Sequence, residues 1–342
     1  MTPDDETRDW YARAGVRSDP RRLLAGELAA GQLFFPPDLI PYARHPAVLA
    51  LPQPRRAELF TRHLYQYLGF TAQFETQVVN RATERIAGGR SGLELPGAVR
   101  LDAYRIYCDE GYHSLYSFDV IQQLSVATGT TPLPYDFAPF LARLDDIGAR
   151  ALPGEPALAQ LLQVVVFETL VTALLNDIPR DGRVLTVVRD IVRDHARDEG
   201  WHHVFFSRLF RRLWAQLPDA TRGRVARCLP ELIRASLLPD LRPVRASLTA
   251  AGLAPATVEE VVHDAYPRAQ VDAGIRSSAR HSVRLFEETG VLEAAGGARA
   301  FEAAELLPPP GMGTGARARH GPPGPDAPGR PAPPGNQGTA ST

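Results

Sequence analysis

The sequence contains one five-residue pattern twice: two acidic residues, glycine, an aromatic residue and histidine. It reads DEGYH at residues 109–113 and DEGWH at residues 198–202. In each copy a glutamate precedes the histidine by three residues, and on a helix this spacing places both side chains on one face. A carboxylate and an imidazole held in this way can bind one metal ion. The glycine costs about 1 kcal/mol relative to alanine inside a helix, which indicates a local requirement at its position.

Three further residues could take part in the same chemistry. His195 precedes Glu199 by four residues and His202 by seven, so on a helix the three side chains point within about 60° of one another. Glu75 lies in LGFTAQFETQVV, and Glu168 lies in LLQVVVFETLVTALL, which is apolar on nearly every side. An unpaired carboxylate in such a helix costs several kcal/mol or holds its proton. Glu168 therefore requires either a metal ion or a buried arginine partner, and both alternatives stay open.

Four long helices are predicted to carry these residues, at about 53–87, 97–128, 156–177 and 183–217. Segments rich in glycine and proline, such as GGRSG, TGTTPLP and IPRDG, separate them. Short links make the first two and the last two helices antiparallel hairpins. The long link between the second and third helices, which is predicted to contain a short helix, allows a crossover. This arrangement is that of the ferritin-like four-helix bundles.

The candidate residues lie at similar positions along these four helices. Glu75 lies about 12 residues before the end of the first helix, and Glu110 about 13 residues after the start of the second. Glu168 and His195 each lie about 12 residues into their helices. Carboxylate-bridged dimetal proteins use one glutamate from each of two helices and a Glu-x-x-His pair from each of the other two. The predicted metal ligands are Glu75, Glu110, His113, Glu168, His195, Glu199 and His202.

The charge of this set favours iron. Its four carboxylates carry four negative charges when ionised, which two ferrous ions would neutralise inside an apolar bundle. Ligation by carboxylates and imidazoles suits Fe(II) or Mn(II) better than a metal that prefers thiolates. A single Glu-x-x-His pair is more often a solvated ion-pair face, but four carboxylates and three histidines at one depth favour a metal centre.

The first acidic residue of each pattern is predicted to orient a histidine of the opposite helix. Asp109 is expected to accept a hydrogen bond from the far ring nitrogen of His202, and Asp198 from that of His113. Such contacts fix the tautomer and the orientation of an imidazole that binds a metal. Pairing of the two aspartates with surface arginines is the alternative.

The glycine and the aromatic residue of each pattern have several explanations. Gly111 and Gly200 could open space beside the metals, permit a π-bulge there, or allow close packing of two helices. Tyr112 and Trp201 are predicted to pack in the core rather than to relay electrons.

Composition and charge argue against several classes of partner. The 342 residues carry a net charge of −1, so no basic field indicates binding to nucleic acid or to an anionic membrane. No apolar run reaches the roughly 18 residues of a membrane span, and the acidic start MTPDDETRDW is unlike a signal peptide. The two cysteines, Cys108 and Cys228, form no CxxC motif and are too few for a disulfide framework. A cytoplasmic protein is therefore expected.

One all-α domain and a tail are predicted. Residues 1–306 are rich in leucine, valine, alanine and arginine and form the ferritin-like domain. Additional helices are expected within residues 221–237, 257–266 and 271–290, packed around the outside of the bundle. Residues 307–342 consist mainly of proline, glycine and small polar residues, which predicts a disordered tail.

The order of the candidate ligands resembles that of a known family. Glu75, Glu110-x-x-His113, Glu168 and His195-x-x-x-Glu199-x-x-His202 are similar to the ligands of the AurF-type diiron N-oxygenases. These enzymes oxidise p-aminobenzoate and related arylamines in antibiotic biosynthesis. The resemblance covers about residues 50–210, with weaker support to about residue 290. The seventh ligand, His195, distinguishes this pattern from ferritins, desaturases and hydrocarbon hydroxylases, which typically have two histidines.

The resemblance implies a division of the ligands between two irons and a homodimer. One iron would be surrounded by Glu75, Glu110, His113 and Glu199. The other would be surrounded by Glu110, Glu168, His195, Glu199 and His202.

The resemblance also implies an activity. Two irons and O₂ would oxidise a small-molecule amine through a peroxo-diferric intermediate, giving a hydroxylamine, nitroso or nitro product. Because this sequence contains no flavin- or ferredoxin-like segment, the electrons would come from a separate reductase or ferredoxin-type donor. No residue is assigned to substrate binding.

Two other functions stay open. A diiron enzyme that hydroxylates C–H bonds, desaturates or oxidatively cleaves a substrate in a biosynthetic pathway would use the same ligands. The third alternative is a protein that is no oxygenase, either a ferritin-like protein that handles iron or peroxide or a metal-free interaction scaffold. Iron storage is disfavoured because the extra helices and the tail exceed the compact four-helix subunit of a cage.

Overall fold

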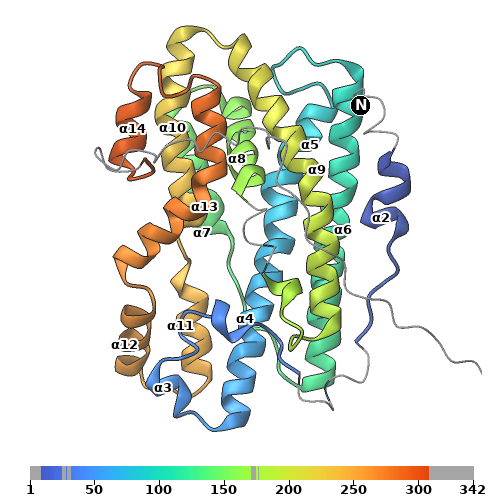
Figure 1. The fold of residues 1–342 in the computed structure, drawn as a ribbon, viewed down its shortest axis with the longest axis vertical. Helices are drawn as coiled ribbons and strands as arrows, with labels where there is room; N and C mark the ends of the chain where they lie inside the picture. Colours follow the sequence, from blue (N-terminus) through green and yellow to red (C-terminus); the bar gives the residue numbers. More distant parts are fainter. Residues whose placement is uncertain (1–8, 25–27, 29–31, 171–174, 176, 308–342) are drawn as a thin grey trace, which may run out of the picture. The chain divides into compact units, whose positions relative to one another are not determined.

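The computed structural model describes residues 9–24, 28, 32–170, 175 and 177–307. In these residues the regular secondary structure is helical, apart from one isolated parallel bridge between Leu33 and Val184. The predicted all-α, ferritin-like fold is confirmed (Figure 1). No helix in the described ranges has a stretch of the length and hydropathy needed to cross a membrane. The predicted tail lies outside the described residues from position 308 onward.

The first long helix contains a π-helical turn. It consists of α4 (Gln53–Phe74), the π-helix η3 (Glu75–Val79) and α5 (Asn80–Ala87), which follow one another directly. Pro52 precedes α4 and Gly88 follows α5, so the helix has the predicted bounds of 53–87. The π-helical turn was not predicted at this place.

The second long helix, α6 (Gly97–Thr128), also has the predicted bounds. It begins after Pro96 and ends at Gly129, whose φ of 70° is a left-handed conformation that glycine adopts without steric cost. Both α4 and α5 pack against α6, as the short link between the two long helices predicts.

The second pair of long helices is formed by α8 (Pro156–Leu170) and α9 (Thr186–Gln216). Of the predicted continuation of α8 to residue 177, positions 171–174 and 176 lie outside the described residues. The two helices pack against each other, and α9 also packs against α6. The predicted short helix in the long link is α7 (Ala138–Ala151), which packs against α8.

Five more helices follow the bundle. Three correspond to predicted stretches, and α11 and α14 were not predicted. They are α10 (Asp219–Leu237), α11 (Leu241–Ala250), α12 (Pro255–Ala265), α13 (Arg268–Glu288) and α14 (Gly297–Ala303). Both α10 and α13 pack against α8 rather than only surrounding the bundle. Because α5, α7 and α9 also contact α8, this helix is covered on nearly every side, which explains its apolar sequence.

The buried apolar side chains form two clusters with a polar layer between them. The first cluster includes α6 up to Ile106 and α9 from Phe205 onward. The second cluster includes α6 from Val120 onward and α9 up to Val192. The buried residues between these limits are mainly aspartate, glutamate and histidine. The fold therefore places a layer of ionisable groups between two water-excluding regions.

The close contact between α7 and α8 gives a test of the fold. A Cβ added at Gly148 would lie 2.6 Å from the Cβ of Ala159, so Gly148→Ala forces the two helices apart. We expect this variant to lose about 1–3 kcal/mol of unfolding free energy in urea denaturation. The control is Gly274→Ala in α13, where an added Cβ meets nothing within 4 Å. The control should be neutral or up to about 1 kcal/mol more stable, and equal stability of the two variants would contradict the packing.

Candidate metal centre

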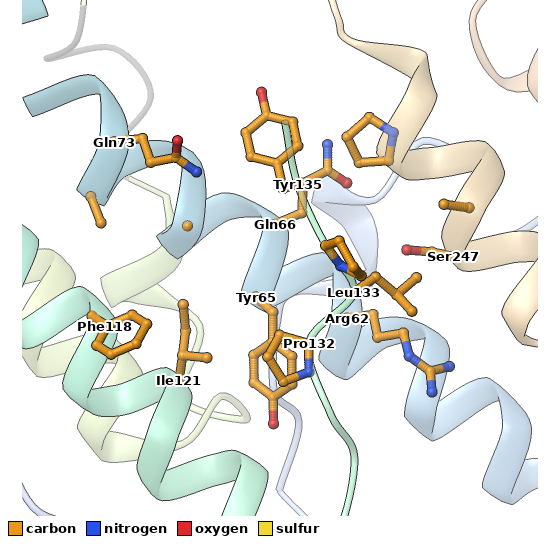
Figure 2. Close-up of a pocket in the computed structure, with 15 residues that line it drawn as sticks. Arg62, Tyr65, Gln66, Gln73, Phe118, Ile121, Pro132, Leu133, Tyr135 and Ser247 are labelled. Atoms are coloured by element: carbon orange, nitrogen blue, oxygen red, sulfur yellow. The ribbon is translucent and has the colours of Figure 1, made fainter. Parts of the chain in front are cut away.

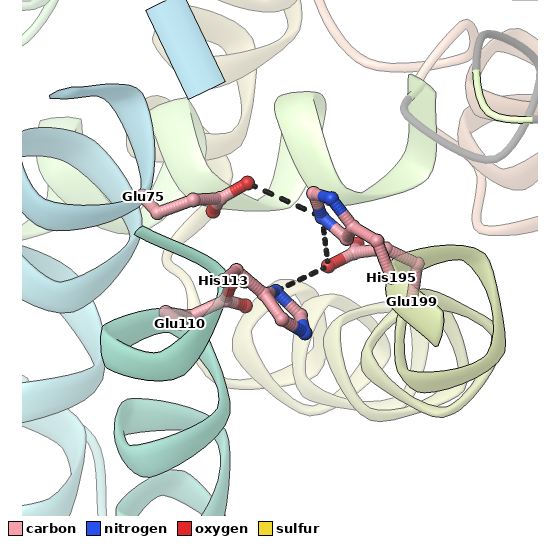
Figure 3. Close-up of side chains that lie close together, drawn as sticks. All are labelled: Glu75, Glu110, His113, His195 and Glu199. Atoms are coloured by element: carbon pink, nitrogen blue, oxygen red, sulfur yellow. Dashed lines mark hydrogen bonds and ion pairs between the residues drawn. The ribbon is translucent and has the colours of Figure 1, made fainter. Parts of the chain in front are cut away.

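The structure brings all seven predicted ligands into the polar layer of the bundle. Their side chains are buried, with exposed fractions between 0% and 4%. They come from four elements, η3, α6, α8 and α9, which are the four long helices predicted to carry them. Figure 3 shows five of them pointing toward one another: Glu75, Glu110, His113, His195 and Glu199.

The side chains divide into two groups that could each hold a metal ion. In each group the potential ligand atoms lie within 4.8 Å of one another. Glu110 and Glu199 belong to both groups, so their carboxylates are placed to bridge two ions. One group contains Glu75, Glu110, His113, His195 and Glu199, and the other contains Glu110, Glu168, Glu199 and His202.

His195 lies in the group opposite to the one that the resemblance implied. Its Nε2 atom is 3.4 Å from Glu75 Oε1 and 3.2 Å from Glu199 Oε1. Its ring centroid is 4.1 Å from that of His113. The division of the ligands between two irons that the resemblance implies stays a prediction, because these distances describe the side chains alone. The reason for the position of His195 is helical geometry: His195 precedes Glu199 by one turn and His202 follows it by one, so the two imidazoles lie on opposite sides of that carboxylate.

The two Glu-x-x-His pairs turn the same ring nitrogen toward the carboxylates. His113 Nδ1 lies 2.9 Å from Glu110 Oε2, and His202 Nδ1 lies 3.1 Å from Glu199 Oε1. His202 Nδ1 is also 2.8 Å from Glu110 Oε1, across the bundle. The Nδ1 atoms therefore face the carboxylate oxygens that both metal groups share, whereas the Nε2 atoms face away from them.

The two Nε2 atoms contact the predicted aspartates. His202 Nε2 lies 3.3 Å from Asp109 Oδ2, and His113 Nε2 lies 3.3 Å from Asp198 Oδ2. Each contact joins α6 to α9, as the sequence analysis expected. The alternative of arginine pairing applies only weakly to Asp198, whose Oδ1 lies 3.7 Å from Arg197 Nε.

Several carboxylate oxygens of the cluster have no hydrogen-bond partner. They include Oε2 of Glu75, both oxygens of Glu168 and Oε2 of Glu199. No arginine pairs with Glu168 in the part of the chain that the structure describes; its ion-pair partner is His202, at 4.0 Å. The arginine alternative for Glu168 is therefore not supported. Buried oxygens without partners are costly, and metal ions would satisfy them.

In the metal-free cluster the pKa values of the glutamates depend on how many positive charges lie near them. Burial, and then the negative charge of Glu110, raises the pKa of Glu75 well above its ordinary value. Burial and the charge of Glu199 do the same to the pKa of Glu168. Burial alone would raise the pKa of Glu110, but His202 and His113 lower it to about 2. Protons thus hold the positions that cations would take, and the oxygen and nitrogen donors fit Fe(II) or Mn(II).

The π-helix of the bundle lies at Glu75 rather than at the two glycines. Glu75 is the first residue of η3, and π-helical turns are frequent at functional sites. Gly111 and Gly200 lie inside the regular helices α6 and α9, so a π-bulge at either glycine was a wrong expectation. A Cβ added at either glycine would meet nothing within 4 Å, which also excludes close packing as their explanation. Open space beside the helices is the explanation that agrees with the structure.

Sequence reasoning missed Tyr116, which lies beside two of the predicted ligands, His113 and His195. Its ring centroid is 5.6 Å from that of His113 and 6.4 Å from that of His195. Its hydroxyl is buried without a hydrogen-bond partner, and burial raises its pKa well above the ordinary value. The sequence could have predicted this position, because Tyr116 follows His113 by three residues and so shares its helix face. Of the two aromatic residues expected in the core, Trp201 is partly buried and packs against one apolar cluster, whereas Tyr112 is partly buried and belongs to neither cluster.

A separate cavity of about 320 Å³ is lined by residues of α4, α6, α11 and the link that follows α6. Figure 2 shows the side chains that line it, among them Arg62, Gln66 and Tyr135. Phe118 and Ile121 contribute from α6. None of the seven cluster residues lines this cavity, so it is distinct from the candidate metal centre.

The raised pKa of Glu168 gives a pH-dependent prediction for the metal-free protein. Because the folded state binds this proton more tightly, the side chain favours folding below its ordinary pKa of 4.5. This contribution is lost as the pH rises through the raised pKa. Glu168→Gln has no such loss, so its Tm should exceed that of the wild type increasingly above about pH 4.5. Near neutral pH we expect a gain of about 1–3 kcal/mol in unfolding free energy.

Thermal unfolding of the two metal-free proteins between about pH 4 and pH 8 measures this effect. The control is Glu287→Gln on α13, because Glu287 is exposed and its replacement should change nothing. A Glu168→Gln protein that is less stable than the wild type at every pH would show that the carboxylate has a stabilising partner.

Comparisons with known proteins agree with this geometry. A family model described as P-aminobenzoate N-oxygenase AurF matches residues 24–290, which include all seven cluster residues. A 4-aminobenzoate N-oxygenase from Streptomyces thioluteus is 25% identical over 237 residues, covering 67% of this chain and 68% of that protein. The chain therefore belongs to the family of the p-aminobenzoate N-oxygenase AurF and is an amine N-oxygenase.

Proposed function

We propose that this chain is a non-haem diiron oxygenase that uses O₂ to oxidise the nitrogen of an aromatic amine. The observation that supports this proposal most is the cluster of four carboxylates and three imidazoles, buried in one layer with unpartnered oxygens. The product would be a hydroxylamine, a nitroso or a nitro compound. In this proposal the seven side chains are metal ligands, and Asp109 and Asp198 orient two of them.

The two groups of side chains define which residues would hold each iron. Glu75, His113 and His195 would hold one ion, and Glu168 and His202 the other. The shared carboxylates of Glu110 and Glu199 would contact both. When bound, the irons supply the activation of O₂ and its reduction.

The residues of the chain have three tasks in this reaction. The four carboxylates provide the negative charge that holds two divalent cations in an apolar interior. The aspartates behind His113 and His202 fix the direction in which the Nδ1 atoms point. The two apolar clusters on either side of the layer keep bulk water from the reacting groups.

The substrate in this proposal is a small aromatic amine of the aminobenzoate type. The support is the family and the name of the relative from Streptomyces thioluteus, a 4-aminobenzoate N-oxygenase. We also propose a separate reductase or ferredoxin-type electron donor. The sequence has two cysteines, whereas an iron–sulfur cluster with cysteine ligands takes four. A cytoplasmic setting and a role in antibiotic biosynthesis remain predictions.

Exposed apolar side chains on α6 support the proposed homodimer. Leu101, Tyr104, Leu115, Phe118 and Val126 have exposed fractions between 46% and 86%. Their spacing places them within about 100° on one side of the helix. A stripe of this kind on a soluble protein is typical of an interaction surface. Sedimentation of a monomer at micromolar concentration would contradict the dimer.

Removal of His195 tests the seventh ligand. His195→Ala should fold, because it removes a buried imidazole from the polar layer and leaves both apolar clusters intact. We expect the affinity for iron to fall at least about tenfold. The iron content measured by metal analysis after reconstitution should therefore fall, and the turnover rate should fall with it. The control is His263→Ala on α12, which is exposed and outside the layer. Full iron loading and normal turnover in His195→Ala would exclude His195 from the centre.

The product of the reaction tests the activity itself. The iron-loaded protein should be supplied with 4-aminobenzoate, ¹⁸O₂ and a chemical reductant, and the products analysed by mass spectrometry. We expect one or two labelled oxygens on the nitrogen of the substrate. Label on a ring carbon would favour the C–H hydroxylase alternative, and release of peroxide without a labelled product would favour a ferritin-like function.

A further inference from the structure

An N-terminal segment lies over the two helices that carry the repeated pattern. This segment, residues 9–24, includes the short helix α2 (Gly15–Ser18), which packs against both α6 and α9 (Figure 1). We call it the N-terminal strap. Ion pairs join it to both helices: Arg21 to Asp119 of α6, and Arg22 to Asp194 of α9.

The strap contributes one N–H donor to each aspartate behind a metal-binding histidine. The indole Nε1 of Trp10 donates to Asp109 Oδ2 over 2.8 Å. The backbone N–H of Gly15 donates to Asp198 Oδ2 over 3.2 Å. These two oxygen atoms are the same ones that lie 3.3 Å from the Nε2 atoms of the histidines on the opposite helices. The two arrangements are therefore equivalent.

The second donor changes what each aspartate can do. An aspartate that contacts only an imidazole can rotate about its side-chain bonds and take the imidazole with it. A second N–H donor on the same oxygen fixes that oxygen, because both hydrogen bonds must be kept in a site of low dielectric. Asp109 is 1% exposed and Asp198 is 8% exposed, so water competes little for either oxygen. The strap donor then fixes the aspartate, and the aspartate fixes the direction of the imidazole.

The residue types of the strap agree with this role. A Cβ at Gly15 would lie 2.9 Å from Asp198 Oδ2, so any larger residue there would have to displace the carboxylate that the backbone N–H contacts. Trp10 is the residue whose donor reaches Asp109 while its ring lies in the wall of a cavity of about 470 Å³. Asp109, Asp198 and Trp201 line the same cavity, so without the strap the two aspartates would face solvent.

We propose that Trp10 and the backbone amide of Gly15 are positioning groups for the metal centre, acting through Asp109 on His202 and through Asp198 on His113. The part that concerns metal binding rests on the proposed diiron function. The hydrogen-bonded chain itself is a property of the folded protein and does not depend on bound metal.

Two substitutions test this proposal on the full-length protein. Trp10→Phe removes the indole N–H but keeps an aromatic ring, and the ion pairs of Arg21 and Arg22 keep the strap docked. Gly15→Ala places a methyl group against Asp198 Oδ2. The control for the first is Tyr11→Phe, which removes a hydroxyl from the half-exposed neighbour and leaves the Trp10 donor in place. The control for the second is Gly274→Ala, which has open space around it.

The first measurement uses metal-free protein labelled with ¹⁵N-histidine. Trp10→Phe should shift the ring-nitrogen resonances of His202, and Gly15→Ala those of His113, whereas the controls should shift neither. The second measurement is titration with Co(II) as a probe of the centre. Both variants should bind about 3- to 10-fold more weakly than the wild type and show altered visible absorption of the bound Co(II).

The outcomes separate this proposal from the proposed function. Unchanged histidine resonances in both variants would overturn the positioning role. Shifted resonances with wild-type Co(II) affinity and spectrum would overturn it as well, because the centre would then be insensitive to the strap. A wild-type protein that binds no Co(II), while the variants still shift the histidine resonances, would overturn the diiron function and leave the hydrogen-bonded chain supported.

Discussion

The structure depends on keeping four carboxylates and three imidazoles together in a layer where water is scarce. Glu110, Glu168 and His202 are fully buried, and several oxygens of the layer have no hydrogen-bond partner. In a metal-free protein this arrangement is tolerated because the pKa values of Glu75 and Glu168 are raised, which favours their protonated forms, and those of His113 and His202 are raised, which favours their charged forms. A cluster of this kind is a poor source of stability and a strong site for divalent cations.

The rest of the fold surrounds this layer. One apolar cluster lies on each side of it along the long helices, so the energy that holds the bundle together comes from regions that do not bind metal. α8 is apolar because five helices cover it, and Glu168, its one acidic residue, lies in the layer. The strap closes the outer side of α6 and α9, where the two aspartates would otherwise meet water. The two apolar clusters and the strap thus exclude solvent from the charged groups of the layer.

The two irons of the proposed centre would have unlike surroundings. His113 and His195 lie with Glu75 in one group, whereas His202 is the only imidazole of the other. The side with two imidazoles is also the side that Tyr116 covers, with its unpartnered hydroxyl. The π-helical turn at Glu75 lies on this side too, and it sets the position of that carboxylate at the cost of regular helical hydrogen bonding. The asymmetry is a property of the protein residues alone.

Much of this was determined by the sequence. The spacing of Glu110 and His113, and the apolar surroundings of Glu168, follow from helical periodicity, which is a local rule; so do the bounds of the first two long helices. Other features depended on the tertiary structure. The side on which His195 lies, the π-helical turn at Glu75 and the reach of Trp10 to Asp109 depend on how helices rotate and pack against one another. Periodicity fixes which residues share a face, but only the packed structure decides which face meets which neighbour.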